Sequence, residues 1–145
     1  MEISEIIITD ISCNGDATGS VSLTITGGTA PYTVFGETDS LSAGSYIITV
    51  IDSNGCEDDV EFIIEEPNEI EVAIETTDVS CNGGSDGSVL LTITGGTAPY
   101  TVSGETDNLS AGSYLVTVND ANGCETEGEF TVEEPDEIEV AIETT

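Results

Sequence analysis

A nine-residue segment, Glu-Ile-Glu-Val-Ala-Ile-Glu-Thr-Thr, occurs at residues 69–77 and again, 68 positions later, at residues 137–145. The same offset relates further pairs of residues: Cys13 and Cys81, Pro31 and Pro99, Tyr46 and Tyr114, Cys56 and Cys124, Pro67 and Pro135. A fixed period of this length indicates small folded units arranged in tandem. We therefore predict one repeat at residues 1–68, a second at residues 69–136, and the first strand of a truncated third repeat at residues 137–145. We expect the sequence to be a piece of a longer tract.

Apolar and polar residues alternate over short runs, which is typical of strands with one buried face. Gly, Pro and Asn separate these runs, and an Asn-Gly pair before each second cysteine is a strong hairpin signal. The residues of the first repeat that we expect to face the core are Val21, Leu23, Ile25, Tyr46, Ile48, Val50, Val60, Phe62 and Ile64. With roughly six or seven strands per repeat and no helical period, the sequence predicts an all-β fold: two tandem immunoglobulin-like antiparallel β-sandwiches of period 68, joined end to end.

Two local features refine this expectation. A Leu-x-x-Gly-x-Tyr turn precedes a strand in both repeats and is similar to the tyrosine corner of sandwich domains. The hydroxyl groups of Tyr46 and Tyr114 are therefore expected to donate to backbone just upstream. Gly128 stands where the first repeat has Val60, and this predicts looser packing in the second repeat.

The charge of the chain excludes several classes of partner. There are 30 Asp and Glu residues and no Lys, Arg or His, which gives a formal net charge of −30 at pH 7. Nucleic acid and anionic membrane surfaces are not expected to bind, because both require basic patches. No apolar run is long enough for a membrane span, so no membrane insertion is expected. The acids are interleaved with Ile, Val and Phe at strand spacing, which argues against disorder.

Catalysis is not expected from this composition. Without His, Lys or Arg, the chain lacks the usual base for a serine nucleophile and any cation for an oxyanion or phosphate. Paired carboxylates are abundant, but carboxylates scattered over tandem loops do not define a glycosidase site. We predict a protein that is not an enzyme and has no certain cofactor.

Calcium is the one cofactor that the composition favours, since it takes six to eight oxygen ligands. The acidic residues nearest the join between repeats are the candidate ligands of an inter-repeat calcium site: Glu65, Glu66, Asp78 and Asp120. The alternative is a solvated acidic rim that holds no ion. Asp52, Asn54 and Asp58 are superficially similar to the start of a calcium loop, but a plain hairpin turn explains this segment better.

Each repeat has two cysteines, separated by 43 positions. Neither pair has CxxC spacing and no His is present, so a zinc site is not favoured. We predict one disulfide within each repeat, Cys13 to Cys56 and Cys81 to Cys124, each stabilising the fold by about 4 kcal/mol on the chain-entropy model. Such bridges imply an oxidising, extracellular setting. The alternative is a pair of buried free thiols in each repeat.

The order of motifs in each repeat resembles the SprB repeat. These motifs are Cys-Asn-Gly, Thr-Gly-Gly-Thr-Ala-Pro-Tyr, Leu-Ser-Ala-Gly-Ser-Tyr, Asn-Gly-Cys and Glu-Glu-Pro, and they span residues 13–67 and 81–135. One departure is that many such repeats have a Trp after the Pro-Tyr strand, where this chain has Phe35 or Ser103. The resemblance implies a secreted, cell-surface adhesin of a gliding bacterium, exported by the type IX secretion system, with the repeats forming its shaft.

We accordingly predict a structural spacer whose partners are neighbouring repeats of the same chain. The alternative function is a calcium-dependent binding module that itself contacts a glycan or surface ligand. Self-association is a further possibility, because residues 137–145 carry an apolar row of Ile138, Val140 and Ile142. Such a row can add as a strand to an exposed sheet edge of another chain.

Overall fold

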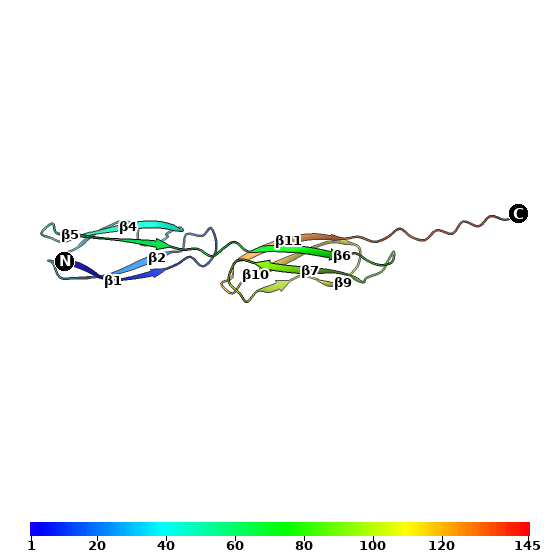
Figure 1. Ribbon diagram of the computed structural model, residues 1–145, viewed down its shortest axis with the longest axis horizontal. Helices are drawn as coiled ribbons and strands as arrows, with labels where there is room; N and C mark the ends of the chain where they lie inside the picture. Colours follow the sequence, from blue (N-terminus) through cyan, green and yellow to red (C-terminus); the bar gives the residue numbers. More distant parts are fainter. The chain divides into compact units, whose positions relative to one another are not determined.

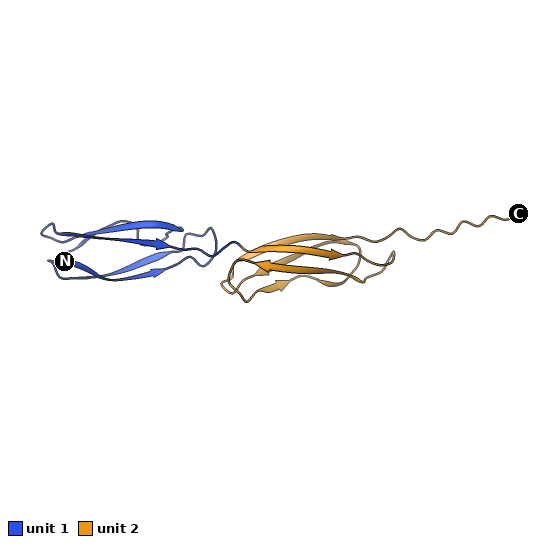
Figure 2. Ribbon diagram, in the orientation of Figure 1, with its two compact units in different colours: residues 1–69 blue, residues 70–145 orange.

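The structure of the chain is a computed structural model that describes residues 1–145. The chain divides into two compact units, residues 1–69 and residues 70–145 (Figure 2). Both units consist of strands and loops, and neither contains a helix.

The first unit is a sandwich of two antiparallel sheets (Figure 1). Its strands are β1 (Glu2–Thr9), β2 (Ser20–Thr26), β3 (Thr33–Phe35), β4 (Gly44–Ile51) and β5 (Glu57–Ile64). One sheet pairs β1 with β2, and the other has the order β3-β4-β5. β2, β4 and β5 carry the alternation that the sequence predicted, so each sheet has an apolar face that packs against the other sheet.

The second unit repeats this arrangement with one additional short strand. Its strands are β6 (Glu71–Thr77), β7 (Gly87–Thr94), β8 (Thr101–Ser103), β9 (Asp107–Leu109), β10 (Gly112–Asn119) and β11 (Glu125–Val132). The sheets have the orders β6-β7-β9 and β8-β10-β11. The predicted all-β fold of antiparallel sandwich repeats is confirmed.

The second unit has six strands, within the six or seven expected, whereas the first has five. The difference lies in the polar loop after the third strand. In the first unit this loop forms an isolated bridge between Gly19 and Leu41 but no strand, whereas its counterpart in the second unit forms β9. Leu41 and its counterpart Leu109 are both almost completely buried. One leucine therefore holds the loop against the core whether or not a strand forms around it.

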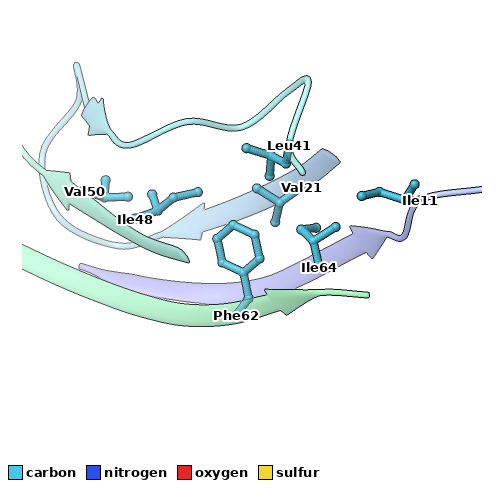
Figure 3. Close-up of a cluster of buried hydrophobic side chains, with 7 residues drawn as sticks. All are labelled: Ile11, Val21, Leu41, Ile48, Val50, Phe62 and Ile64. Atoms are coloured by element: carbon cyan, nitrogen blue, oxygen red, sulfur yellow. The ribbon is translucent and has the colours of Figure 1, made fainter. Parts of the chain in front are cut away.

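The core of the first unit lies between its two sheets. Figure 3 shows Val21 on β2 and Phe62 on β5 pointing into the same space, with the other members of the cluster around them. The buried residues of this cluster are Ile11, Val21, Leu41, Ile48, Val50, Phe62 and Ile64. The remaining residues predicted to face inward are partly buried against it: Leu23, Ile25, Tyr46 and Val60.

The loosening expected at Gly128 is not observed. Gly128 is buried, and a Cβ placed there would lie 2.7 Å from Cδ1 of Ile74. The side chain of Ile74, on β6, thus occupies the space that a larger residue at 128 would need. The prediction was wrong because it considered one strand without the strand that packs against it.

Residues 137–145 form no strand, although they are identical in sequence to residues 69–77, which include β6. Their apolar row is exposed, at 90% for Ile138, 79% for Val140 and 82% for Ile142. β6 is held by pairing along its length with β7. The second copy of the segment has no paired strand in this structure, so its sequence preference alone does not place it in a sheet.

Candidate functional site

The loops of each unit gather at two ends, and each end is named after the cysteine that it holds. In the first unit, the Cys56 end holds the start of β1, the loop 27–32 and the turn 52–56. The Cys13 end holds the loops 10–19 and 36–43 and the residues 65–67 that follow β5. The second unit has a Cys124 end and a Cys81 end at the corresponding positions. Nearly all side-chain-to-backbone hydrogen bonds that join distant loops lie at these ends, which makes them the candidate functional sites.

A single carboxylate organises the Cys56 end. Oδ1 of Asp52 accepts hydrogen bonds from the backbone N–H groups of Asn54 and Cys56, both at 2.9 Å. Its Oδ2 accepts from the N–H of Thr29 at 3.0 Å, in the loop between β2 and β3. Asp52 is 5% exposed and joins two loops that are far apart in sequence. It therefore acts as a structural anchor for this end of the sandwich.

Asp120 makes the same set of bonds at the Cys124 end. Its Oδ1 accepts from the N–H groups of Asn122 at 2.8 Å and Cys124 at 2.9 Å, and its Oδ2 from the N–H of Thr97 at 2.9 Å. Asp120 is 7% exposed. The repetition shows that the anchor is a property of the repeat.

These bonds fix the ionisation of both anchors. At Asp52, the N–H of Cys56 lowers the pKa most, followed by that of Thr29, and these bonds outweigh the opposing effect of burial. At Asp120, burial is the largest influence and raises the pKa, but the N–H groups of Thr97 and Cys124, with others, together bring it below its usual value. Hydrogen bonds to the charged form produce this direction of shift. Both residues are carboxylates at neutral pH.

The loop 27–32 is shaped to meet this anchor. The amide of Asn54 donates to Oγ1 of Thr29 at 2.9 Å, and the N–H of Ser53 donates to the carbonyl of Thr29 at 2.9 Å. Gly28 has φ of +68°, and a Cβ there would lie 2.9 Å from Oδ2 of Asp52. Glycine therefore allows the close approach of backbone to carboxylate. The hydroxyl of Tyr32 also donates to the carbonyl of Gly27 at 2.6 Å.

The Cys13 end is closed by a second set of bonds between its loops. Oδ1 of Asp10 accepts from the N–H of Glu65 at 2.9 Å, and the N–H of Ile11 donates to the carbonyl of Glu65 at 3.0 Å. The loop after β1 adds two more bonds, one from the amide of Asn14 to the carbonyl of Pro67 at 3.0 Å and one from the N–H of Gly15 to Oε2 of Glu66 at 2.8 Å. These four bonds attach the loop after the first strand to the segment after the last.

The Cys81 end repeats these bonds with the corresponding residues. Asp78 accepts from the N–H of Glu133 at 2.9 Å, and the amide of Asn82 donates to the carbonyl of Pro135 at 3.1 Å. The N–H of Gly83 donates to Oε2 of Glu134 at 2.7 Å. The Asn-Gly and Glu-Glu-Pro motifs of the repeat are thus partners in one closure.

The predicted tyrosine corners are confirmed. The hydroxyl of Tyr46 donates to the carbonyl of Ser42, and that of Tyr114 to the carbonyl of Ser110, each at 2.9 Å. The ring of Tyr46 also stacks on Phe62, with ring centroids 5.7 Å apart.

The four residues predicted as one calcium site do not form a single cluster. Asp78 is bonded at the Cys81 end of the second unit, after β6, whereas Asp120 lies at the Cys124 end, before β11. An eight-residue strand such as β11 spans about 26 Å, far more than the 2.3–2.6 Å ligand distances of calcium permit. The prediction of a site shared by Asp78 and Asp120 is therefore wrong. Within either unit, no group of three or more acidic or cysteine side chains is placed to hold a metal ion.

The individual oxygen atoms of these residues also have other roles. Glu66 accepts from the N–H of Gly15, and Glu65 takes part in the closure through its backbone. Sequence reasoning missed that the acidic residues near the loops accept hydrogen bonds from the backbone of the same unit. The available signal was the Asp-x-Asn-Gly-Cys pattern, because Asp side chains commonly bond backbone N–H groups two residues ahead in turns.

The cysteines also differ from the predicted pairing. Cys13 and Cys124 are each in a disulfide, whereas Cys56 and Cys81 are free thiols at the surface. Neither predicted bridge within a repeat is present. The reason is geometric: in each unit the two cysteines lie at opposite ends, separated by the length of β5 or β11. A disulfide requires Cα atoms within about 7 Å, and these strands span about 26 Å.

A shallow groove recurs on the two units beside the tyrosine corner. In the first unit it has a volume of about 510 Å³, and its lining residues are Ser45, Tyr46, Ile47, Glu61, Phe62 and Ile63. In the second unit it has a volume of about 490 Å³ and is lined by the corresponding residues Ser113, Tyr114, Leu115, Glu129, Phe130 and Thr131. The groove combines aromatic edges with one carboxylate in each copy.

The fold and these ends define a class: a tandem repeat protein built from acidic β-sandwiches, each closed at both ends by its own carboxylates. Residues 6–33 and 73–102 each match the SprB repeat. The matched residues run from the first strand of each unit into the short strand after the Pro-Tyr loop, β3 or β8. The SprB repeat is a repeat of cell-surface adhesins related to gliding motility. Neither the curated proteins nor the solved structures compared with this chain gave a match.

The chain also has no helix with the length and apolar composition needed to cross a membrane.

Proposed function

We propose that these repeats are structural spacers in the shaft of a large, secreted cell-surface adhesin of a gliding bacterium, exported by the type IX secretion system. In this proposal the repeats carry load and separate the adhesive part of the protein from the cell. They have no catalytic role.

One observation carries the proposal: the chain enters each unit at one end and leaves it at the other. β1 starts at the Cys56 end, where Glu2 pairs with Thr26, and β5 finishes at the Cys13 end, where Ile64 pairs with Gly44. The strands β6 and β11 do the same in the second unit. Each unit therefore advances the chain by about the length of one eight-residue strand, about 26 Å. A repeat entered and left at the same end would add no such length.

The same geometry suits a unit under tension. β1 and β5 run in the same direction and lie against each other, and the chain is pulled at the start of one and the end of the other. The N–H of Ile3 donates to Oδ2 of Asp58 at 2.9 Å, and the N–H of Glu65 donates to Oδ1 of Asp10. Tension applied in this direction loads such contacts together, along the strands. The closures at both ends support this proposal because they join the first and last strands.

Pulling the chain from both termini tests the proposal. The measurement is made in reductant, so that Cys13 and Cys124 are thiols. We expect two separate unfolding events, each releasing about 220–245 Å of extended chain for 68 residues before subtraction of the folded length. Asp10→Ala and Asp78→Ala each weaken one closure and should each lower the force of one event. A single unresolved extension without force peaks would contradict a load-bearing role.

The recurring groove supports a second candidate, the calcium-dependent binding module. The stacked pair Tyr46 and Phe62 borders it, and Tyr114 and Phe130 border its counterpart, with ring centroids 5.5 Å apart. Aromatic faces and edges are common in binding sites that combine apolar and polar contacts. In this proposal, a glycan would lie in the groove, with calcium supplied from solution near Glu61 or Glu129.

Titration of the labelled chain with calcium chloride and then with oligosaccharides separates the two candidates. A binding module requires calcium-dependent shifts of the amide signals of residues 45–47 and 61–63, with the same shifts at residues 113–115 and 129–131. Magnesium chloride at equal ionic strength is the control for general screening. If the amide signals shift in all acidic segments, and to the same extent with calcium as with magnesium, the calcium-dependent binding module is excluded.

Self-association through residues 137–145 is a separate proposal about this chain. The exposed row of Ile138, Val140 and Ile142 would add to a sheet edge of a second molecule by strand addition. Sedimentation should then show a concentration-dependent dimer that disappears when residues 137–145 are deleted. A charge-matched variant with Ile138, Val140 and Ile142 changed to Ser keeps the length and the acids and should also remain monomeric.

A further inference from the structure

The four cysteines occupy two kinds of position. Cys13 and Cys81 lie in the loop after the first strand of a unit and are named the early cysteines. Cys56 and Cys124 directly precede the last strand and are named the late cysteines. The structure contains each kind in both states: Cys13 and Cys124 are oxidised, and Cys56 and Cys81 are free and exposed. Each free thiol therefore has an oxidised counterpart in an equivalent setting.

The loops around the two late cysteines are held in the same way. The N–H of Cys56 donates to Oδ1 of Asp52 at 2.9 Å, and that of Cys124 donates to Oδ1 of Asp120 at 2.9 Å. The carbonyl of each cysteine also accepts from the N–H of its own aspartate at 2.9 Å. The backbone that presents the free Cys56 thus has the hydrogen bonds of the backbone that presents an oxidised cysteine. No rearrangement of this loop is needed for Cys56 to form a disulfide.

The same holds for the early cysteines. Asn14 beside Cys13 and Asn82 beside Cys81 both donate to the carbonyl of the proline that ends their unit, at 3.0 and 3.1 Å. The glycine after each asparagine donates to a glutamate, at 2.8 and 2.7 Å. Cys81 is therefore presented by a loop closed like that of the oxidised Cys13.

We propose that Cys56 and Cys81 are disulfide-forming sites whose partner is a cysteine of the opposite kind in another copy of the repeat. The oxidised residues are one early cysteine, Cys13, and one late cysteine, Cys124. The free thiols are also one of each kind, the early Cys81 and the late Cys56. A pair within one unit is excluded by the length of its last strand. In this proposal the partner lies in a second molecule, so that Cys81 of one copy bonds Cys56 of the next. A contact between the Cys81 end of one molecule and the Cys56 end of another is heterologous. Because each molecule keeps one unused end, further copies can be added in a row.

The reaction requires an oxidant, for which we name a small-molecule disulfide, oxidised glutathione. The thiolate of Cys56 attacks one glutathione sulfur and releases one glutathione thiolate, giving a mixed disulfide. The thiolate of Cys81 from the second molecule then attacks the sulfur of Cys56, forms the protein disulfide and releases the second glutathione. Two protein thiols lose two electrons and two protons, and one glutathione disulfide is reduced to two thiols.

Oxidation of the purified chain tests the pairing. The protein is incubated with oxidised glutathione in 1 M NaCl, where the Debye length is about 3 Å and repulsion between acidic ends is screened. We expect a ladder of dimers, trimers and longer species on non-reducing gels. Mass spectrometry of the bands after cleavage at Glu residues should identify the linkage between Cys56 and Cys81. Glutathione adducts at both thiols without any ladder would overturn the proposal.

The single variants C56S and C81S give the sharper test. Alone, each retains one free thiol and should give no species beyond a dimer. Mixed in equal amounts, with one variant isotope-labelled, they should give the mixed dimer in large excess over both homodimers. A mixed dimer only twice as abundant as either homodimer is the result of random collision and would overturn the rule of early with late. Melting curves of both variants confirm that the fold is retained, because both thiols are exposed.

Discussion

At the scale of single residues, the most informative side chains are Asp52 and Asp120, which are buried carboxylates in a chain without a single cationic side chain. Buried carboxylates require partners. Here the partners are backbone N–H groups, and the charge is thereby used to fix two loops. An acidic composition can thus be part of the folding of the unit, in addition to its effect on the surface.

Replacing Asp52 by Asn should destabilise the first unit. The change keeps one oxygen acceptor but removes the charge and replaces one accepting oxygen by a donor, which faces either the N–H of Thr29 or those of Asn54 and Cys56. We expect a lower thermal midpoint at pH 7. Asp59→Asn is the matched control, because Asp59 is exposed on β5 and its loss only reduces the net charge. A midpoint equally unaffected in both variants would show that Asp52 is no anchor.

Filling Gly128 should stabilise the second unit. The first unit has Val60 at this position, and its Ile6 corresponds to Ile74, so the fold accommodates both side chains together. A Cβ at 128 meets mainly the end of the flexible Ile74 side chain. Gly128→Val should therefore raise the free energy of unfolding of this unit by about 0.5–1 kcal/mol, as removal of a strand glycine does. The reverse change, Val60→Gly, is the control and should lower the free energy of unfolding of the first unit by at least as much. If Gly128→Val instead destabilises the second unit, the side chain of Ile74 cannot move to make room for the valine.

At the scale of strands and loops, the alternation of Val21, Ile48 and Phe62 was enough to predict which faces are buried. The tyrosine corners were predictable as well, because their turn and their strand are adjacent in sequence. The location of the cysteines was not predicted, because a spacing of 43 residues says nothing of strand direction. Cys13 follows a strand and Cys56 precedes one that runs the same way, which places them at opposite ends. The carboxylates at the loops were misassigned for a similar reason, since their partners are backbone groups, which any sequence supplies.

The duplicated segment shows how far a strand depends on its neighbour. Residues 71–77 are β6 and pair with β7 from Glu71 to Thr77, whereas residues 139–145 have the same sequence and no strand. We predict that a longer protein, in which residues 78–136 are appended again after Thr145, will convert residues 139–145 into a strand. Hydrogen exchange should then show protected amides there, at the level of β6. If the amides of residues 139–145 still exchange fast in the longer protein, a following strand is not sufficient to make this segment a strand, and the prediction is wrong.

At the scale of the whole molecule, the net charge of −30 and the lowered pKa values of the two anchors act in opposite directions as pH changes. Lowering the pH from 7 towards the isoelectric point of about 4.1 removes the net charge and so relieves self-repulsion, which stabilises the fold. The anchors have pKa values below 3.8, the usual value for Asp. Their contribution is fully present above that pH and is lost as the pH falls through their folded pKa values.

Thermal unfolding at low salt should therefore have its highest midpoint between about pH 4 and 5, between the neutral range and the acid range in which the anchors become protonated. In 1 M NaCl, where the Debye length is about 3 Å, the rise between pH 7 and 5 should largely disappear. The fall below pH 4 should persist, because hydrogen bonds to buried carboxylates are screened much less. The double variant Asp52→Asn, Asp120→Asn should retain the rise and have a smaller fall. A midpoint that decreases steadily from pH 7 at low salt would mean that repulsion among the 30 acids contributes little to the stability of the folded chain.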